Sequence, residues 1–168
     1  LSRIGRDCVG ALQFLPDGID PGPAGAIEAR PVADEEIGRI LANLARNPLG
    51  IDDDGAFRIS IAGAQEKTAL LFCHGAWHIP HGTTATTHIL KPQIGVLPEA
   101  IDLSQSVENE HFCMSLISAF GLPVARTQIA DFNGQRVLVV ERFDRQNTRD
   151  GRLLRIPQED LCQALSVP

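Results

Sequence analysis

The sequence predicts an α+β fold, an antiparallel β-sheet with flanking helices. Between residues 57 and 91, short apolar segments alternate with tight turns, which is the pattern of antiparallel strands. Residues 103–120 form a helical pattern that Gly121 ends, and Asn133-Gly134 is a typical hairpin dipeptide between two further strands. A chain of 168 residues is long enough for one domain or for one lobe of a larger protein.

The first third of the chain predicts one strand and one helix. We expect the strand at Gly10–Leu15, followed by Pro- and Gly-rich turns at 16–25. The helix is expected over 33–46, because acidic residues fill its first turn and apolar residues recur three and four apart. These apolar residues are Ile37, Ile40, Leu41 and Leu44.

The middle and last thirds supply the sheet and two more helices. Strands are expected at 57–61, 66–73, 76–79, 86–91, 123–131 and 135–142. The loop at 62–65 and the turn at His74-Gly75 separate the first three of these strands. Pro157 indicates a final helix at 158–165, since proline is favoured just inside a helix start.

Composition excludes several classes of protein. The formal net charge is −6, which does not favour direct nucleic-acid binding or a basic membrane-facing surface. No apolar run approaches the roughly 18 residues of a membrane span. The four cysteines are widely scattered, so we expect reduced, mostly buried thiols in a cytoplasmic protein. Because the chain begins at Leu1 rather than at Met, we expect it to be part of a longer protein.

Lys91 and Glu110 form the first candidate pair. Lys91 ends an apolar strand, and a cation on a half-buried face needs a partner. Glu110 lies among apolar residues on one face of the following helix, whereas Glu108 falls about 200° around that helix and should face solvent. A strand lysine paired with a helix glutamate is the arrangement with which kinases hold nucleotide phosphates. The simpler alternative is an edge-strand lysine that extends to water.

Two further segments could contact a nucleotide. The small-residue turn within 60–68 could lay backbone N–H groups over phosphates, although such turns are commonly structural. The apolar strand at 137–140 runs abruptly into Glu141, Arg142 and Phe143, which could present backbone groups and an aromatic face to a base. The alternative is a core strand that exits to a polar loop.

Other chemistry is weakly supported. His74, His78, His81 and His88 cluster around one hairpin, but they lack a companion thiolate or carboxylate at zinc-site spacing. The acidic run at 52–54 is typical of a solvated loop. No serine lies in a G-x-S-x-G nucleophile elbow. We therefore predict no metal site within the chain.

Several blocks of the sequence, taken together, resemble the HipA family, the serine/threonine kinase toxins of bacterial toxin–antitoxin pairs. The most specific blocks are Ser-Ile-Ala-Gly-Ala-Gln-Glu-Lys at 60–67 and Val-Glu-Arg-Phe-Asp-Arg at 140–145. Further similarity covers residues 4–11, 86–91, 102–110 and 154–160. The resemblance implies that residues 56–168 form the ATP-binding lobe of a kinase-like fold and that residues 1–55 are a partial N-terminal segment.

The resemblance also implies roles for individual residues. Lys91 would contact ATP phosphates with Glu110 as its partner, and Glu141, Arg142 and Phe143 would form the hinge against adenine. Ser60 corresponds to the serine that the family autophosphorylates, and a phosphate there would repel ATP phosphates. The loop that would cover the phosphates comprises Ala62, Gly63, Ala64, Gln65, Glu66 and Lys67.

The catalytic lobe of the family is expected outside this chain. No D-x-x-x-x-N or D-F-G arrangement of catalytic residues is found, so we expect no catalytic residue here and expect the Mg²⁺ ligands elsewhere in the parent protein. The implied partners are a HipB-like helix-turn-helix antitoxin, operator DNA mainly through that antitoxin, and a protein substrate, glutamyl-tRNA synthetase in the family. The alternatives are a non-catalytic interaction or nucleotide-binding module, and the lobe of a small-molecule or lipid kinase.

Overall fold

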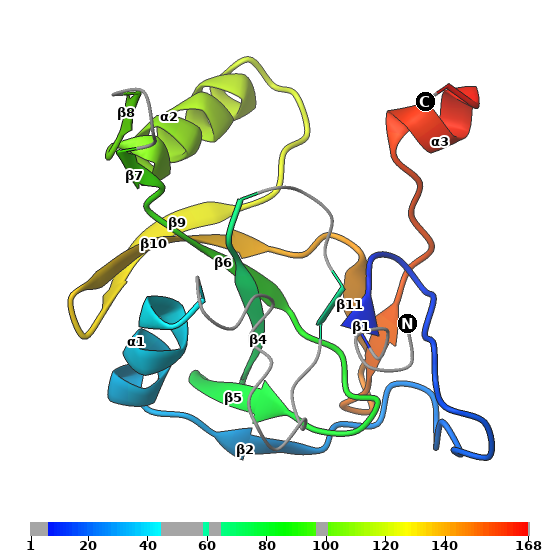
Figure 1. The fold of residues 1–168 in the computed structure, drawn as a ribbon. Helices are drawn as coiled ribbons and strands as arrows, with labels where there is room; N and C mark the ends of the chain where they lie inside the picture. Colours follow the sequence, from blue (N-terminus) through cyan, green and yellow to red (C-terminus); the bar gives the residue numbers. More distant parts are fainter. Residues whose placement is uncertain (1–6, 45–58, 61–64, 97–100, 168) are drawn as a thin grey trace.

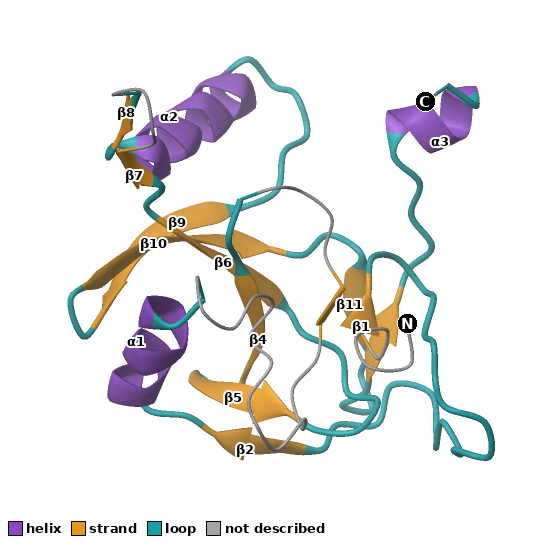
Figure 2. Cartoon of the chain, in the orientation of Figure 1, coloured by secondary structure: helices purple, strands orange, loops and turns teal. Residues whose placement is uncertain are grey.

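The computed structural model describes residues 7–44, 59–60, 65–96 and 101–167, with the backbone alone at 59–60 (Figure 1). Twelve strands and three helices are found in this part of the chain (Figure 2). The helices are α1 (Asp34–Ala42), α2 (Ser106–Ala119) and α3 (Leu161–Leu165). The strands are β1 (Asp7–Cys8), β2 (Ala29–Pro31), β3 (Ile59–Ser60), β4 (Thr68–Cys73), β5 (Ala76–Pro80), β6 (His88–Pro92), β7 (Gly95–Val96), β8 (Asp102–Leu103), β9 (Thr127–Phe132), β10 (Gln135–Glu141), β11 (Arg145–Asn147) and β12 (Leu153–Arg155).

A six-stranded antiparallel sheet is the centre of the fold. Its strand order is β2-β5-β4-β6-β10-β9, and every neighbouring pair is antiparallel. The remaining strands form three short two-stranded pairs: β1 with β3, β7 with β8, and β11 with β12. The predicted fold class, an antiparallel sheet with flanking helices, is confirmed.

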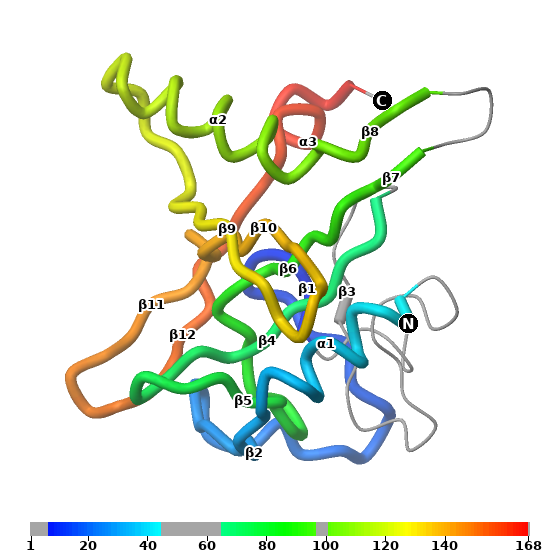
Figure 3. The backbone as a smooth tube through the Cα atoms, turned by 90° about the vertical axis from the view of Figure 1, so that its left-hand side faces the viewer, coloured from blue at the N-terminus to red at the C-terminus, as the bar shows by residue number. Residues whose placement is uncertain are grey.

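Successive side chains of each strand point to opposite sides, so the sheet has two distinct faces. One face, here called the α1 face, carries Leu70, Leu90 and Val139 and packs against α1. The other, here called the lysine face, carries Ile89, Lys91 and the residues paired with them. Figures 1 and 3 show α1 and α2 on opposite sides of the β9–β10 hairpin.

The main core lies between α1 and the sheet. Ile37, Leu41 and Leu44 of the helical segment are almost completely buried against the α1 face. Gly38 lies so close to the β9–β10 turn that a Cβ atom there would come within 2.6 Å of the Phe132 carbonyl oxygen. This close approach explains why the helix has a glycine at its contact with the hairpin.

The predicted strand at Gly10–Leu15 is wrong. β1 occupies residues 7–8 instead, and Gly10 takes a φ of +69° while its N–H donates to Asp144. Leu12 and Phe14 are exposed, so the apolar residues that suggested a strand do not face the core.

Element boundaries differ from the expectations by a few residues. α2 begins at Ser106 rather than at 103, and α3 begins at Leu161, where the Asp160 side chain accepts from the Gln163 N–H as a capping box. The expected helix end at 45–46 and the strand residues 57, 58 and 61 lie outside the described residues. Five short strands were not predicted: β2, β7, β8, β11 and β12.

Of the four cysteines, only Cys8 is buried. Cys113 and Cys162 are exposed, so the expectation of mostly buried thiols is wrong for these two. Of the helices in the described part of the chain, none has both the length and the apolar character needed to cross a membrane.

Candidate functional site: a lysine pair beside an apolar pocket

Lys91 and Glu110 meet on the lysine face of the sheet. The Lys91 ammonium donates to both carboxylate oxygens of Glu110, at 2.6 and 2.7 Å. Lys91 comes from the end of β6 and Glu110 from the second turn of α2. Both side chains are partly exposed, at 22% and 36%, so the pair can still be approached by a ligand.

Gln93 fixes the position of α2 relative to this pair. Its Oε1 accepts the N–H of Val107 at 2.8 Å and the hydroxyl of Ser106 at 3.0 Å. The residue that precedes α2, Gln105, supplies no side-chain cap, so the amide of Gln93, the residue after β6, serves as the cap. Val107 is buried, which holds the helix start against the sheet. Sequence reasoning missed this role because the cap lies twelve or more residues before the helix.

Glu108 does not simply face solvent, contrary to our expectation. It accepts from the Gln93 amide at 2.8 Å and forms an ion pair with Arg136 on β10. Hydrogen bonds from its own backbone and from Gln93, together with Arg136, lower the pKa of the Glu108 carboxyl. Helical spacing predicted correctly that Glu108 and Glu110 diverge, but not that Glu108 has its own partners.

Lys67 and Lys91 lie opposite each other across two strands. The β4–β6 ladder pairs Thr68 with Leu90 and Ala69 with Ile89, so the next position places Lys67 opposite Lys91. These are the two lysines of the whole sequence. Cross-strand neighbours have Cβ atoms about 5 Å apart, and like charges in that position are destabilising. An anion that contacts both ammonium groups would relieve this repulsion.

The environment of Lys67 supports this interpretation. Its side chain is almost completely buried, and its ammonium donates to the Gln65 carbonyl at 2.7 Å. Burial, and then the nearby charge of Lys91, lower the pKa of Lys67, while Glu66 opposes the shift. Gln65 in turn donates its amide to the Pro92 carbonyl at 3.1 Å, which ties the loop before β4 to the end of β6.

A pocket of about 330 Å³ lies beside the segment that follows β10. Ile89 and Val140 are cross-strand partners on the lysine face and contribute apolar lining. Glu141, Arg142 and Phe143 line the same pocket, and Phe143 is 69% exposed. Because Ile89 lies two residues before Lys91 on β6, the lysine pair is roughly 7 Å further along the same face. A flat apolar group in the pocket could therefore continue into an anionic group at the lysines. We refer to this cavity as the hinge pocket.

The Arg142 side chain is not available to bind a ligand, because its guanidinium lies in a buried network. Its guanidinium makes hydrogen bonds to Asp144, Asp7, Thr86 and the Cys8 carbonyl, at 2.8–3.2 Å. The side chain is 2% exposed, so its charge is fully committed to this buried network. Only the backbone of Arg142 could therefore take part in a hinge, and its N–H donates to the Thr87 carbonyl at 2.8 Å.

The other candidate residues are only partly placed. Ala62, Gly63, Ala64 and the acidic run at 52–54 lie outside the described residues. For Ser60 the backbone alone is described, in β3 opposite Cys8 of β1. Glu66 is exposed. Within the described ranges, no three His, Cys, Asp or Glu side chains are grouped so as to hold a metal ion.

Comparisons with known proteins identify the family. Residues 59–168 match the HipA-like C-terminal domain family. The chain is 44% identical over 171 residues to Y4mE of Sinorhizobium fredii, whose name describes it as a kinase. This alignment covers 100% of the present chain and 39% of that protein. It is 34% identical to the serine/threonine-protein kinase toxin HipA of Shewanella oneidensis, over 98% of this chain and 36% of that protein.

A solved structure shows the same relationship. The chain matches the complex of Shewanella oneidensis HipA, HipB and operator DNA with a TM-score of 0.67 and 32% identity, over 99% of this chain and 37% of the matched chain. The chain thus spans less than two fifths of the length of these relatives. With a family match over residues 59–168, this chain belongs to the HipA-like family.

Proposed function

We propose that this chain is the ATP-binding lobe of a HipA-like serine/threonine protein kinase toxin. The observation that carries the proposal is the opposed pair Lys67 and Lys91, with Glu110 aligning Lys91, on the same sheet face as the hinge pocket. Adenine would occupy the apolar hinge pocket and the phosphates would lie at the two lysines, with the loop at 62–67 over them. Bound ATP would supply the phosphoryl group, with Mg²⁺ neutralising its charge.

The proposed activity belongs to the longer parent protein. It would phosphorylate a hydroxyl on a translation factor, with glutamyl-tRNA synthetase as the candidate target, and would autophosphorylate at Ser60. A HipB-like antitoxin, and operator DNA through it, are the proposed partners, because the matched structure contains HipA with HipB and operator DNA. A cytoplasmic location is part of the same proposal.

Titration of ATP with Mg²⁺ into the parent protein tests the lobe assignment. We expect Lys91→Ala and Glu110→Gln to weaken ATP binding about 10- to 100-fold, because hydrogen bonds to charged groups contribute about 1.5–3 kcal/mol each. Glu108→Gln is the matched control, since Glu108 lies on the same helix but pairs with Arg136. Equal effects at Glu108 and Glu110 would contradict the assigned site.

Mass spectrometry of the same protein after incubation with ATP tests whether Ser60 is autophosphorylated. Phosphate on Ser60 that is lost in Lys91→Ala would support autophosphorylation. ATP binding without phosphate on Ser60 would support the nucleotide site but reject autophosphorylation. A parent protein that does not bind ATP would reject the proposed function.

A further inference from the structure

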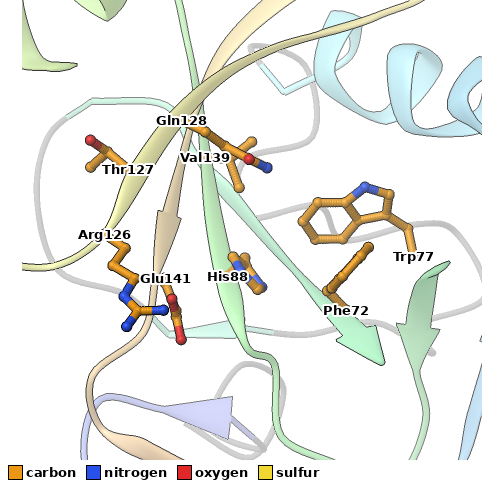
Figure 4. Close-up of a pocket in the computed structure, with 8 residues that line it drawn as sticks. All are labelled: Phe72, Trp77, His88, Arg126, Thr127, Gln128, Val139 and Glu141. Carbon is orange, nitrogen blue, oxygen red and sulfur yellow. The ribbon is translucent and has the colours of Figure 1, made fainter. Parts of the chain in front are cut away.

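A second pocket, of about 400 Å³, lies on the α1 face, behind the hinge (Figure 4). α1 covers one part of this face, and the pocket occupies another part, with Val139 of β10 in its lining. Its volume falls in the range of roughly 300–1,000 Å³ that is typical of small-molecule sites. The nucleotide site proposed above lies on the opposite face of the sheet, so its ligand does not occupy this pocket.

One wall of this pocket is aromatic. Phe72 and Trp77 are cross-strand partners whose ring centroids are 4.9 Å apart, and the His88 ring lies 5.2 Å from Trp77. Phe72 is 40% exposed, so a ring remains available to a ligand. Burial lowers the pKa of His88, although Glu141 opposes this, so the imidazole is neutral at neutral pH and adds a third uncharged ring.

The other wall carries two opposite charges. The β9–β10 ladder pairs Thr127 with Val140, so the next position places Arg126 opposite Glu141. The Glu141 N–H donates to the Arg126 carbonyl at 2.9 Å, and Figure 4 shows the two side chains pointing the same way. Within the part of the chain that the structure describes, neither side chain makes a hydrogen bond or an ion pair, and both residues are exposed. An acceptor and a planar donor are thus available side by side.

We propose that this pocket binds a small zwitterionic aromatic molecule of the class of free aromatic amino acids. The ligand ring packs against Phe72 and Trp77, which favour edge-to-face or offset contacts. The ligand ammonium lies at the Glu141 carboxylate and beside the aromatic faces, which also attract cations. The ligand carboxylate lies at Arg126, whose guanidinium can bind it through two parallel hydrogen bonds. A neutral ring compound would leave both charges without partners.

Glu141 connects this pocket to the hinge. The residue lines both cavities, with its side chain on the α1 face and its neighbours Arg142 and Phe143 at the hinge pocket. If ATP binds as proposed above, a ligand held by the Glu141 side chain also acts on the hinge backbone. Linkage then requires that ATP and the aromatic ligand change each other's affinity by the same factor.

Calorimetric titration of the parent protein with L-tryptophan and L-phenylalanine tests the site. We expect saturable binding that is at least about 10-fold weaker for tryptamine, N-acetyl-L-tryptophan and L-alanine, which lack the carboxylate, the ammonium and the ring respectively. Phe72→Ala and Arg126→Gln should each weaken L-tryptophan binding by a similar factor. Phe14→Ala, an equally exposed phenylalanine in the segment before β2, is the matched control and should leave it unchanged.

The outcomes separate this site from the proposed function, because ATP is titrated into the same protein. ATP binding without binding of either amino acid up to millimolar concentration overturns the second site alone. Amino-acid binding that is unchanged in Phe72→Ala and Arg126→Gln places the ligand elsewhere and also overturns the second site. Amino-acid binding in a protein that does not bind ATP supports the site and rejects the proposed kinase lobe. Two affinities that do not change each other reject the coupling through Glu141.

Discussion

At the residue scale, the buried charge network around Arg142 joins four distant parts of the chain. The Asp7 carboxylate accepts from Arg142, Arg145 and Arg155, and from both the N–H and the hydroxyl of Thr86. These residues come from β1, from the segment before β6, from the segment after β10 with the first residue of β11, and from β12. The network therefore fixes the backbone that follows β10, and with it the wall of the hinge pocket.

Removing the central cation should be strongly destabilising. Arg142→Ala leaves Asp7 and Asp144 buried beside fewer positive charges, and breaking a buried ion pair in this way costs about 3–5 kcal/mol. Arg136→Ala is the control, because the Arg136–Glu108 pair is largely exposed and should contribute about 0–1 kcal/mol. Denaturant unfolding of the parent protein measures both. Similar losses for the two variants would show that the network does not stabilise the lobe.

Asp144 should make the stability depend on pH in the acidic range. Burial alone would raise the pKa of Asp144, but the hydrogen bonds and charge of Arg142, together with Arg145 and the Gly10 N–H, lower it below its ordinary value of 3.8. The unfolded state then takes up the proton first as the pH falls, so the stabilisation is complete above about pH 4 and decreases below it. The stability difference between the wild type and Asp144→Asn should therefore shrink from pH 6 to pH 3 in unfolding experiments. A constant difference would contradict the assigned shift.

The residues that sequence reasoning placed correctly are those whose signals are local. Lys91 and Glu110 could be predicted because strand alternation and helical spacing fix the direction of each side chain. The Arg142 guanidinium could not be placed in this way, because Asp7 lies 135 residues away from it and Thr86 lies 56 residues away. Similarly, Arg126 and Glu141 become neighbours only through the β9–β10 register.

At the element scale, α1 is held in place by a close contact with the β9–β10 turn. A Cβ atom at position 38 would lie 2.6 Å from the Phe132 carbonyl oxygen and 2.8 Å from the Asn133 Cβ, so the helix or the hairpin would have to move. Gly38→Ala should destabilise the protein by about 1–3 kcal/mol, although alanine is otherwise the better helix former. Glu35→Ala, at an exposed position of the same helix, is the control. Thermal unfolding of both variants checks this, and a stabilised Gly38→Ala variant would contradict the close packing.

Elements with strong periodic or turn signals were predicted, and elements made only by tertiary pairing were not. β4, β5 and β10 have apolar alternation or flanking turn residues, including the left-handed turns at His74-Gly75 and Asn133-Gly134. β2 has only three residues and exists because it pairs with β5. The predicted division at residue 55 stays a prediction, although β2 is a strand of the central sheet and α1 packs against that sheet.

At the scale of the whole molecule, α2 has apolar residues on every side. Exposed apolar side chains follow its outer surface and the loop beyond it, namely Phe112, Leu116, Ile117, Phe120 and Leu122. A surface helix of a monomeric protein normally has a polar outer face. Exposed apolar surface of this kind indicates a contact with another protein surface. Because the chain spans 39% or less of its relatives, the remainder of the parent protein is the natural candidate for that contact.

This surface predicts how the 168-residue chain behaves when it is produced alone. We expect it to bind an apolar dye such as ANS and to self-associate in size-exclusion chromatography, because exposed apolar patches drive association. The double variant Phe112→Ser, Phe120→Ser should reduce both effects, whereas Phe72→Ser, on the other side of the sheet, should reduce them much less. In the parent protein the same double variant should lower the unfolding temperature, because those side chains would there be covered. A monomeric isolated chain without dye binding would show that α2 needs no partner surface.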